Sequence, residues 1–262
     1  MSRLAELSLT QLARCYDVAA RYNPRLDLIP LLPSAGWSIS KVAALEDLRT
    51  FLQEGSTQLY EAICAARPSA LEPVTIQEVA QPDSDDVPSE SNAAVTAQSD
   101  APLRRYQHVA VGGTFDRLHA GHRILLAAAA LSSLSNLYIG ITSDKLLQRK
   151  QHHDLLESFD HRQDAALAFM KAVNPRIAIR SGALTDPEEP TQAATDPSMQ
   201  ALVVSQETIQ GGHSINTYRT QHGSKPLELI VIELVGIHAA TPSGKLSSTE
   251  LRAMEAQKRG PA

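Results

Sequence analysis

Residues 109–122 read VAVGGTFDRLHAGH, and this stretch decides the fold. It opens with three apolar residues that are typical of a short buried strand, and the strand ends at Gly112 and Gly113. The run of Ile, Leu and Ala that follows predicts a long apolar helix over residues 124–134, and residues 137–142 (LYIGIT) predict another strand. Strand, helix and strand in this order predict a βαβ unit.

The alternation continues downstream. We expect a helix over residues 160–173, with Asp160 as its N-cap and Asn174-Pro175 as its stop. Further strands are predicted at residues 177–180, 201–204 and 227–234, and a last helix at 248–257. The pattern predicts an α/β fold, a Rossmann-like parallel sheet with helices on both faces, whose ligands bind beyond the carboxyl ends of the strands.

The composition changes upstream of this domain. Residues 68–103 hold seven Asp or Glu and no Lys or Arg, interleaved with Pro, Ser, Ala and Gln, so we expect residues 68–104 to be an acidic disordered linker. Apolar residues recur at helical spacing between 40 and 66, with a break near Gly55, which predicts two short amphipathic helices. The prediction is therefore a small helix-rich region over residues 1–67, of unknown role, and an α/β domain over residues 105–262.

The overall charge and the cysteines limit the classes of function. The formal net charge of -5 gives no general basic surface, so we expect no nucleic-acid partner. No apolar run is long enough for a membrane helix, and the N-terminus lacks the apolar region of a signal peptide, so we expect a cytoplasmic protein without membrane contact. Cys15 and Cys64 lack disulfide or zinc spacing and are expected to be reduced core thiols.

The residues after the first strand suit an anion. The glycines allow close approach of a phosphate to the backbone, Thr114 offers a hydroxyl, and the following helix begins with free N–H groups and the positive end of its dipole. His119 and His122 are three residues apart, so both imidazoles can face one phosphoryl group. The alternatives are a pair of surface histidines or a metal site, but no third ligand with recognisable spacing lies nearby.

Two motifs together resemble a known superfamily. The string over residues 112–122 looks like the HxGH signature of the nucleotidylyltransferases, and residues 245–252 (KLSSTELR) resemble the SSTxxR-like segment that accompanies it. With residues 140–144 (GITSD) and 203–208 (VVSQET), followed by Gly211-Gly212 and Asn216, the chain resembles the eukaryotic and archaeal type of pantetheine-phosphate adenylyltransferase over roughly residues 107–259. The resemblance implies transfer of AMP from ATP to 4'-phosphopantetheine, which gives dephospho-coenzyme A and pyrophosphate.

The resemblance also implies roles for single residues. His122 is expected at the α-phosphate in the transition state, His119 at the ATP phosphates beside it, and Thr114 at the attacking phosphate. Among the basic residues after the second strand, Lys150 is preferred to Lys145 as the phosphate-binding residue, although a solvated helix face is the alternative for either. The expected catalytic set is His122, His119 and Lys150.

The binding residues follow in the same way. Those expected to bind ATP are Gly113, Thr114, Phe115, His122, Gln206, Glu207, Thr208, Asn216, Ser247, Ser248, Thr249 and Arg252, and those expected to bind the acceptor are Thr114, Lys150, Arg162 and Ser205. Arg162 is structural in the alternative interpretation, and Ser247 can be a plain helix N-cap. Mg²⁺ is expected to arrive with ATP, and no carboxylate cluster identifies a protein ligand for it.

Other interpretations stay open. A neighbouring enzyme, such as a nicotinamide-mononucleotide or flavin-mononucleotide adenylyltransferase, would use the same motifs. A cytidylyltransferase is disfavoured because the chain lacks an Arg-Thr-x-Gly-Ile-Ser segment. A non-catalytic nucleotide-binding protein is the alternative from another class. The sequence leaves room for a homo-oligomer and does not specify one.

Overall fold

The structure is a computed structural model that describes residues 8–23, 26–53, 57–78, 103–232 and 246–259. The chain divides into two compact units. The larger unit combines Met1–Leu31 with Ser99–Ala262, and the smaller unit is Leu32–Gln98.

The larger unit is built on a five-stranded parallel sheet. Its strands are β3 (Tyr106–Gly113), β4 (Ser133–Thr142), β5 (Ala178–Leu184), β6 (Ala201–Ser205) and β7 (Glu228–Ile232), in the spatial order β5-β4-β3-β6-β7. The order reverses at β3, because β4 pairs with one edge of β3 and β6 with the other. The predicted Rossmann-like parallel sheet is confirmed, and β3, which ends in the two glycines, lies at the switch point where ligands of such sheets bind.

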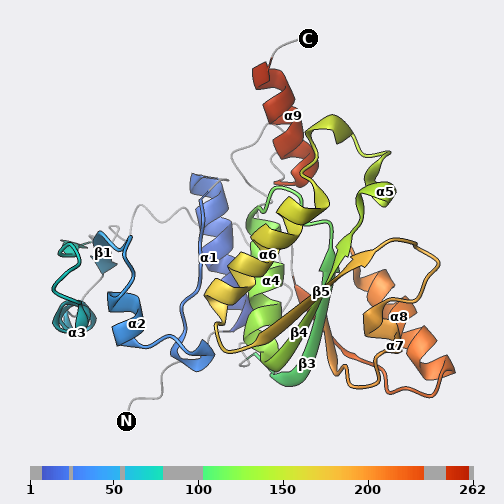
Figure 1. Ribbon diagram of the computed structural model, residues 1–262, viewed down its shortest axis with the longest axis horizontal. Coiled ribbons are helices and arrows are strands. Elements are labelled where there is room, and N and C mark those ends of the chain that lie inside the picture. Colours follow the sequence, from blue (N-terminus) through green and yellow to red (C-terminus); the bar gives the residue numbers. More distant parts are fainter. Residues whose placement is uncertain (1–7, 24–25, 54–56, 79–102, 233–245, 260–262) are drawn as a thin grey trace, which may run out of the picture. The chain divides into compact units, whose positions relative to one another are not determined.

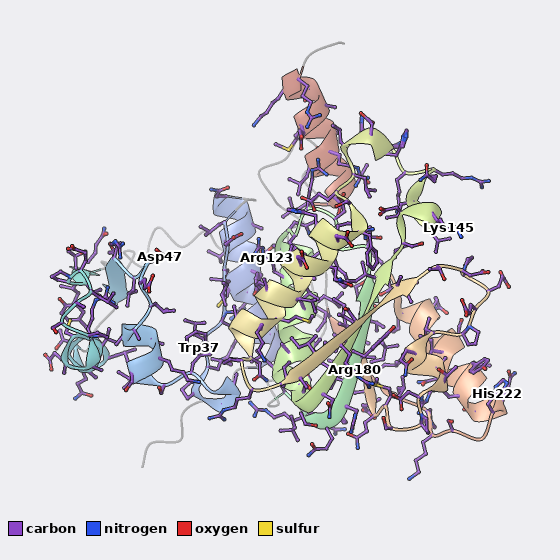
Figure 2. All side chains as sticks on the ribbon, in the orientation of Figure 1. Trp37, Asp47, Arg123, Lys145, Arg180 and His222 are labelled. Carbon is purple, nitrogen blue, oxygen red and sulfur yellow. The ribbon has the colours of Figure 1, made fainter. Side chains whose placement is uncertain are left out.

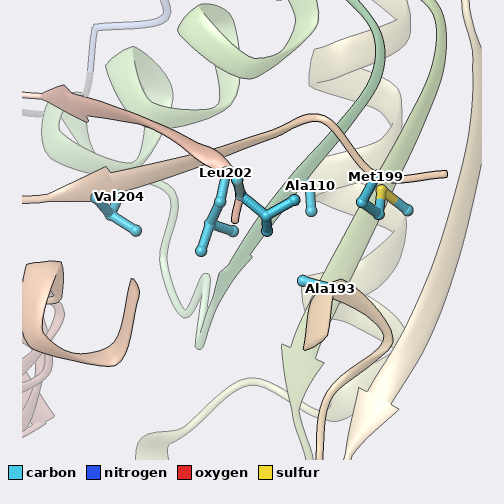
Figure 3. Packing of buried hydrophobic residues seen from close by; sticks show 6 residues of the cluster. Ala110, Ala193, Met199, Leu202 and Val204 are labelled. Atoms are coloured by element: carbon cyan, nitrogen blue, oxygen red, sulfur yellow. The ribbon is translucent and has the colours of Figure 1, made fainter. Parts of the chain in front are cut away.

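Helices cover both faces of the sheet (Figure 1). They are α4 (Ala120–Ser132) and α6 (Phe159–Val173) on one face, and α7 (Gln192–Thr195) and α8 (Ile209–Gln221) on the other. Successive residues of β3 point to opposite faces, so Ala110 packs with the α7–α8 side while Val109 and Val111 face the other layer. Figure 3 shows the α7–α8 cluster, in which Met199 and Leu202 pack near Ala110. Both faces of the central strand are therefore buried.

The start of α6 differs from the prediction. Ser158 is the N-cap, since its hydroxyl accepts the N–H of His161, and Asp160 lies in the first turn instead. A carboxylate in the first turn is still favoured by the helix dipole, which explains why Asp160 looked like a start signal. The stop at Asn174 is confirmed, and its side-chain amide donates to the carbonyl of Ala130 at 2.8 Å.

The N-terminal helix α1 (Leu9–Tyr22) belongs to the larger unit. It begins with a capping box, in which Ser8 and Gln11 exchange side-chain and backbone hydrogen bonds. Its buried side chains are Leu12, Tyr16 and Ala20, spaced four apart on one face, and the helix packs on α4. The contacts thus place the unit boundary after Leu31, whereas the composition put a boundary at residue 67.

The smaller unit contains α2 (Ile39–Ala43), α3 (Gln58–Ala66), β1 (Thr50–Gln53) and β2 (Thr75–Glu78), after the short turn Pro33–Ala35. The second predicted helix is present as α3, but the first ends at Ala43, and its prediction was wrong for residues 50–53, which form β1. The prediction of disorder was wrong for residues 75–78, because β2 is held by parallel pairing with β1, a partner 25 residues away in the sequence. Arg67 connects this unit internally, because its guanidinium donates to the carbonyls of Ala43, Leu45 and Leu48. Residues 79–102 of the predicted linker lie outside the described residues.

Cys15 on α1 and Cys64 on α3 are free but exposed, because each lies on the face of its helix away from the buried side chains, so the expectation of core thiols was wrong. Within the described segments, no helix has the length and apolar character needed to cross a membrane.

Candidate active site

A cavity of about 470 Å³ lies at the carboxyl ends of β3, β4 and β6. Its walls combine the first motif and the second motif with the strand ends. The lining residues are Gly112, Gly113, Thr114, Phe115, His119, Gly121, His122, Leu125, Thr142, Lys150, Leu156, Ser205, Glu207, Thr208, Leu246, Ser247, Ser248, Thr249 and Arg252. The structure thus brings most of the predicted site residues into one pocket, where the topology places ligands.

The loop between β3 and α4 has an unusual backbone. Phe115 and Arg117 have φ angles of 55° and 47°, in the left-handed region that residues with a side chain rarely occupy. The ring of Phe115 is fully buried, and a Cβ at Gly113 would come within 2.9 Å of it. The absence of a side chain at Gly113 therefore allows Phe115 to be buried. It also leaves the backbone of Gly113 accessible from the pocket.

The two histidines form a stacked pair at the start of α4. Their ring centroids are 4.0 Å apart, with an interplanar angle of 27°. His119 is the N-cap of α4, because its Nδ1 accepts the N–H of Gly121 at 3.2 Å. An Nδ1 that accepts leaves the proton of the neutral ring on Nε2, so His119 can donate from Nε2 to a ligand.

Burial makes both imidazoles weak bases. It lowers the pKa of His119 to about 4 and holds the pKa of His122 well below its usual range, with the neighbouring His119 as a further cause. The pair is therefore neutral at pH 7 in the free protein. Nδ1 of His122 is buried without a hydrogen-bond partner among the described atoms. A buried polar atom of this kind destabilises the fold unless a ligand or a water molecule forms a hydrogen bond with it.

The basic residues after β4 differ in their position relative to the cavity. Lys150 borders the cavity, whereas Lys145, on the short helix α5 (Asp144–Leu147), is exposed and does not (Figure 2). Lys150 follows α5, before the turn His153–Leu155, and its N–H donates to the carbonyl of Leu147 at 2.9 Å. This position agrees with the choice of Lys150 over Lys145.

Arg162 lies beneath the pocket wall and does not line the cavity. Its fully buried guanidinium donates to the carbonyls of Thr114 at 2.5 Å and Thr142 at 2.8 Å, and pairs with Asp144 at 2.7 Å. Nε donates to the carbonyl of Glu157. Arg162 therefore connects the ends of β3 and β4, which is the structural alternative, and its geometry gives no support to the expected contact with the acceptor.

The end of β6 contributes part of what was expected. Ser205, Glu207 and Thr208 line the cavity, and Gln206 does not. Asn216, in the middle of α8, lies outside it and uses its amide on Leu227, donating to the carbonyl at 2.9 Å and accepting the N–H at 2.7 Å. The expected adenine-side role of Asn216 therefore has no geometric support.

The second motif forms the N-terminus of α9 (Ser248–Arg259). Ser247 caps it, since its hydroxyl accepts the N–H of Glu250 at 3.2 Å. The hydroxyl of Ser248 donates to the carbonyl of Asp116 at 2.8 Å. The cap leaves the first N–H groups of the helix at the pocket, a typical anion site.

Asp116 is the residue that the sequence argument missed. Its side chain is fully buried, and its carboxylate pairs with Arg252 and accepts the N–H of Glu157 at 3.0 Å. The sequence signal was available, because Asp116 is the single acid inside the first motif and Arg252 ends the second. Only the three-dimensional structure shows that these two charges meet.

A second cavity, of about 690 Å³, has a different set of lining residues. It is bordered by α6, by α9 and by residues 27–29, and it contains none of the predicted site residues. Its lining includes two ion pairs, Arg123 with Asp27 and Arg117 with Glu255 at 2.7 Å, and Arg117 also contacts Asp116 at 3.3 Å. The chemistry expected from the motifs therefore belongs to the smaller cavity.

The chain is similar to characterised proteins over its larger unit. The cytidylyltransferase-like family model matches residues 110–254. A phosphopantetheine adenylyltransferase of Saccharomyces cerevisiae is 37% identical over 149 residues, which cover 56% of this chain and 48% of that protein. Proteins of the same name from Thermococcus kodakarensis and Methanosarcina mazei are 34% and 36% identical and cover 57% and 58% of this chain.

The coverage of the relatives differs. The matched residues cover 87% of the Thermococcus protein and 94% of the Methanosarcina protein, whereas this chain spans about half the length of the yeast relative. The matched region contains both motifs and all the strands of the five-stranded sheet except the start of β3. Since the family model covers more than half of the residues, the chain belongs to the cytidylyltransferase-like family.

Proposed function

We propose that this protein transfers AMP from ATP to 4'-phosphopantetheine, giving dephospho-coenzyme A and pyrophosphate. The observation that carries the proposal is the convergence of the His119–His122 pair, Lys150 and the N-terminus of α9 on one cavity. The names of the yeast and archaeal relatives support the choice of acceptor. Such an enzyme works on soluble metabolites, and we expect it in the cytoplasm.

The reaction needs alignment and charge stabilisation more than a nucleophilic side chain. An oxygen of the acceptor phosphate, already ionised at neutral pH, attacks the α-phosphorus of ATP, and the bond from that phosphorus to the pyrophosphate oxygen breaks. Negative charge grows on the non-bridging oxygens and on the leaving pyrophosphate. Neutral imidazoles that donate N–H groups and one nearby cation are suited to stabilise that charge.

Each residue of the pocket has a place in this scheme. His122 would donate to the α-phosphate, and His119 would donate from Nε2 to the phosphates beside it. Lys150 would balance the charge between acceptor and α-phosphate, while Thr114 would orient the attacking phosphate. The burial that lowers the pKa values of the histidines also strengthens their hydrogen bonds to a charged oxygen, because the local dielectric constant is low.

The remaining lining residues suit the rest of ATP. The capped N-terminus of α9, with Ser247, Ser248 and Thr249, would bind the β- and γ-phosphates. The backbone at Gly113 and Phe115 allows close approach to the triphosphate, and Ser205, Glu207 and Thr208 at the end of β6 would contact the nucleoside. Gln206 and Asn216 are left out of this set because they do not line the cavity.

Mg²⁺ would enter with the nucleotide. Throughout the described ranges, no three His, Cys, Asp or Glu side chains are grouped as a metal centre requires, and Glu207 is the sole carboxylate residue among the described lining residues. This donor set fits a cation that keeps most of its contacts to phosphate oxygens and water. Bound there, Mg²⁺ would neutralise part of the charge on the triphosphate.

The test is pyrophosphate release from Mg-ATP with 4'-phosphopantetheine, nicotinamide mononucleotide or flavin mononucleotide as the acceptor. We expect release with 4'-phosphopantetheine alone, and a loss of about 100-fold or more in kcat in His122→Ala, since removal of one oxyanion donor costs about that much in a hydrolase. Release with a different acceptor would replace the substrate and keep the reaction class. If none supports release, a non-catalytic nucleotide-binding role would replace the proposal.

A further inference from the structure

The guanidinium of Arg252 is occupied by protein atoms, although Arg252 borders the cavity. Its side chain is 2% exposed. One terminal nitrogen pairs with the carboxylate of Asp116, the other donates to the hydroxyl of Thr249 at 3.2 Å, and Nε donates to the carbonyl of Gln151 at 3.0 Å. Each of the three nitrogens therefore has a protein acceptor, and three of the five N–H groups are used in these bonds, which hold the guanidinium in its buried position.

Asp116 is held as tightly from its own side. Its second carboxylate oxygen accepts the N–H of Glu157 at 3.0 Å, while Glu157 accepts the N–H of Arg117 at 2.7 Å. The carbonyl of Asp116 accepts the hydroxyl of Ser248. One residue of the first motif thus contacts the second motif through both its backbone and its side chain.

The loop around Asp116 needs such support. Its neighbours Phe115 and Arg117 both have left-handed backbone angles, and a conformation of this kind persists only where the surroundings impose it. Two residues farther along, His119 begins α4. Whatever fixes Asp116 therefore fixes the entry to the helix that carries both histidines.

We infer that the buried pair of Asp116 and Arg252 is a positioning device that sets the two phosphate-binding segments against each other, and that Arg252 acts through Asp116 rather than on a phosphate. The inference rests on the proposed function for the identity of the ligand. The cation that meets the nucleotide is then Lys150, whose side chain borders the same cavity.

The chain offers a matched control. Arg117 and Glu255 connect the same loop to the same helix, at 2.7 Å, but they border the larger cavity and not the proposed site. Arg117 also contacts Asp116, through its other terminal nitrogen, at 3.3 Å. Glu255→Gln removes the ion pair with Arg117, and it removes neither that contact nor the pair of Asp116 and Arg252. A defect caused only by a loosened helix should appear in both sets of variants.

The binding experiment measures the Kd of Mg-ATP for Asp116→Asn, Arg252→Gln, the double variant and Glu255→Gln. A positioning pair predicts that each single variant weakens binding to a similar extent, on the order of tenfold, and that the double variant is no weaker than either, because it leaves no unpaired buried charge. Glu255→Gln should stay within about twofold of the wild type. A direct contact of Arg252 with phosphate predicts unchanged or tighter binding in Asp116→Asn, and that result would overturn the inference.

Hydrogen exchange on the ligand-free proteins is the second arm, and it depends on neither nucleotide nor acceptor. Asp116→Asn should raise exchange in residues 113–122 and in residues 247–252 together, while Glu255→Gln should not reproduce this in residues 113–122. Exchange that rises in only one segment would refute the coupling. If the wild type binds Mg-ATP but transfers no AMP, the proposed function fails, and the binding and exchange experiments still test the inference. If the wild type binds no Mg-ATP, the exchange experiment alone tests the inference.

Discussion

Gly121 shows how closely the two histidines are packed. It lies between them, and a Cβ at this position would come within 3.1 Å of Cε1 of His119. The ring of His119 cannot retreat easily, because it stacks on His122 and its Nδ1 is held by the Gly121 N–H. The glycine in the HxGH string therefore preserves the mutual position of the rings, besides leaving room for a phosphate.

Gly121→Ala is expected to lower kcat/KM by about tenfold or more, because a small displacement of a positioned group is costly in the transition state. The change should be seen in steady-state pyrophosphate release, with the free energy of unfolding little affected. Gly211→Ala on α8 is the control, since nothing lies within 4 Å of a Cβ there. Equal activity of both variants would show that the rings tolerate the extra methyl group.

The lowered pKa of His119 makes stability depend on pH. The folded state holds a neutral ring down to about pH 4, whereas the unfolded chain binds a proton near 6.5. The contribution is therefore fully present above pH 6.5 and declines as the pH falls from there towards 4. Between pH 7 and pH 4.5 we expect the free energy of unfolding to fall by about 2 kcal/mol on account of this residue.

Urea unfolding of His119→Asn at the two pH values measures this effect. Asparagine has a side-chain oxygen that can cap α4. The variant therefore removes the titratable imidazole and keeps an acceptor for the cap. Its loss of stability on acidification should be smaller than that of the wild type by the same amount. An identical loss in both proteins would show that His119 does not titrate as its burial indicates.

At the scale of elements, α1 supports the helix that carries the histidines. Its apolar face packs on α4, and residues that follow it add the ion pair between Asp27 and Arg123, the residue directly after His122. The phenol of Tyr16 also donates to the carbonyl of Leu28 at 3.1 Å, which holds the segment after α1 against the helix. We therefore expect α1 to unfold together with the rest of the larger unit.

Leu12→Ala is expected to lower the free energy of unfolding of that unit by about 2 to 4 kcal/mol, as large-to-small changes at buried sites do. The measurement is urea unfolding followed through activity loss and circular dichroism. Val18→Ala, on the exposed face of the same helix, should change it by less than about 0.5 kcal/mol. An unchanged midpoint of activity loss in Leu12→Ala would mean that α1 is an independent attachment.

Elements with a strong local signal could be predicted from the sequence. The apolar strand before the glycines, the long helix after them and the stop at Asn174 are all determined by neighbours in the chain. α8 was missed because its sequence, IQGGHSINTYRTQ, contains two glycines and no clear apolar stripe. It is stabilised by distant partners instead, for example through Arg219, which donates to the carbonyls of Ala193 and Asp196 at 2.8 Å.

The residues of the candidate site differ in the same way: some can be predicted from local sequence, and others depend on distant contacts. The place of His119 and His122 at the cavity could be predicted because motif spacing is local, and Lys150 was chosen from the resemblance and its position in the predicted loop. The pairing of Asp116 with Arg252, and the structural use of Arg162 and Asn216, depend on contacts between residues far apart in the sequence. No local pattern distinguishes an arginine that binds a ligand from one that binds carbonyl groups.

For the whole molecule, the division into two units predicts which residues become more stable when nucleotide binds. The described residues that line the cavity all belong to the larger unit. We expect saturating Mg-ATP, at about 100 times its Kd, to stabilise that unit by about 2.7 kcal/mol. Hydrogen exchange should show protection in residues 106–232 and no change in residues 32–78, and protection of the latter would mean that the smaller unit takes part in binding.

The buried pair of Asp116 and Arg252 also has a consequence for synthesis of the chain. The two residues are 136 positions apart, so the ribosome completes both histidines and most of the sheet long before it adds the partner of Asp116. In a nascent or prematurely terminated chain that lacks Arg252, Asp116 loses its buried counter-charge and keeps the contact with Arg117 at 3.3 Å. We therefore expect competence to bind nucleotide to be acquired late and in one step, and truncation products to be inert rather than partly active.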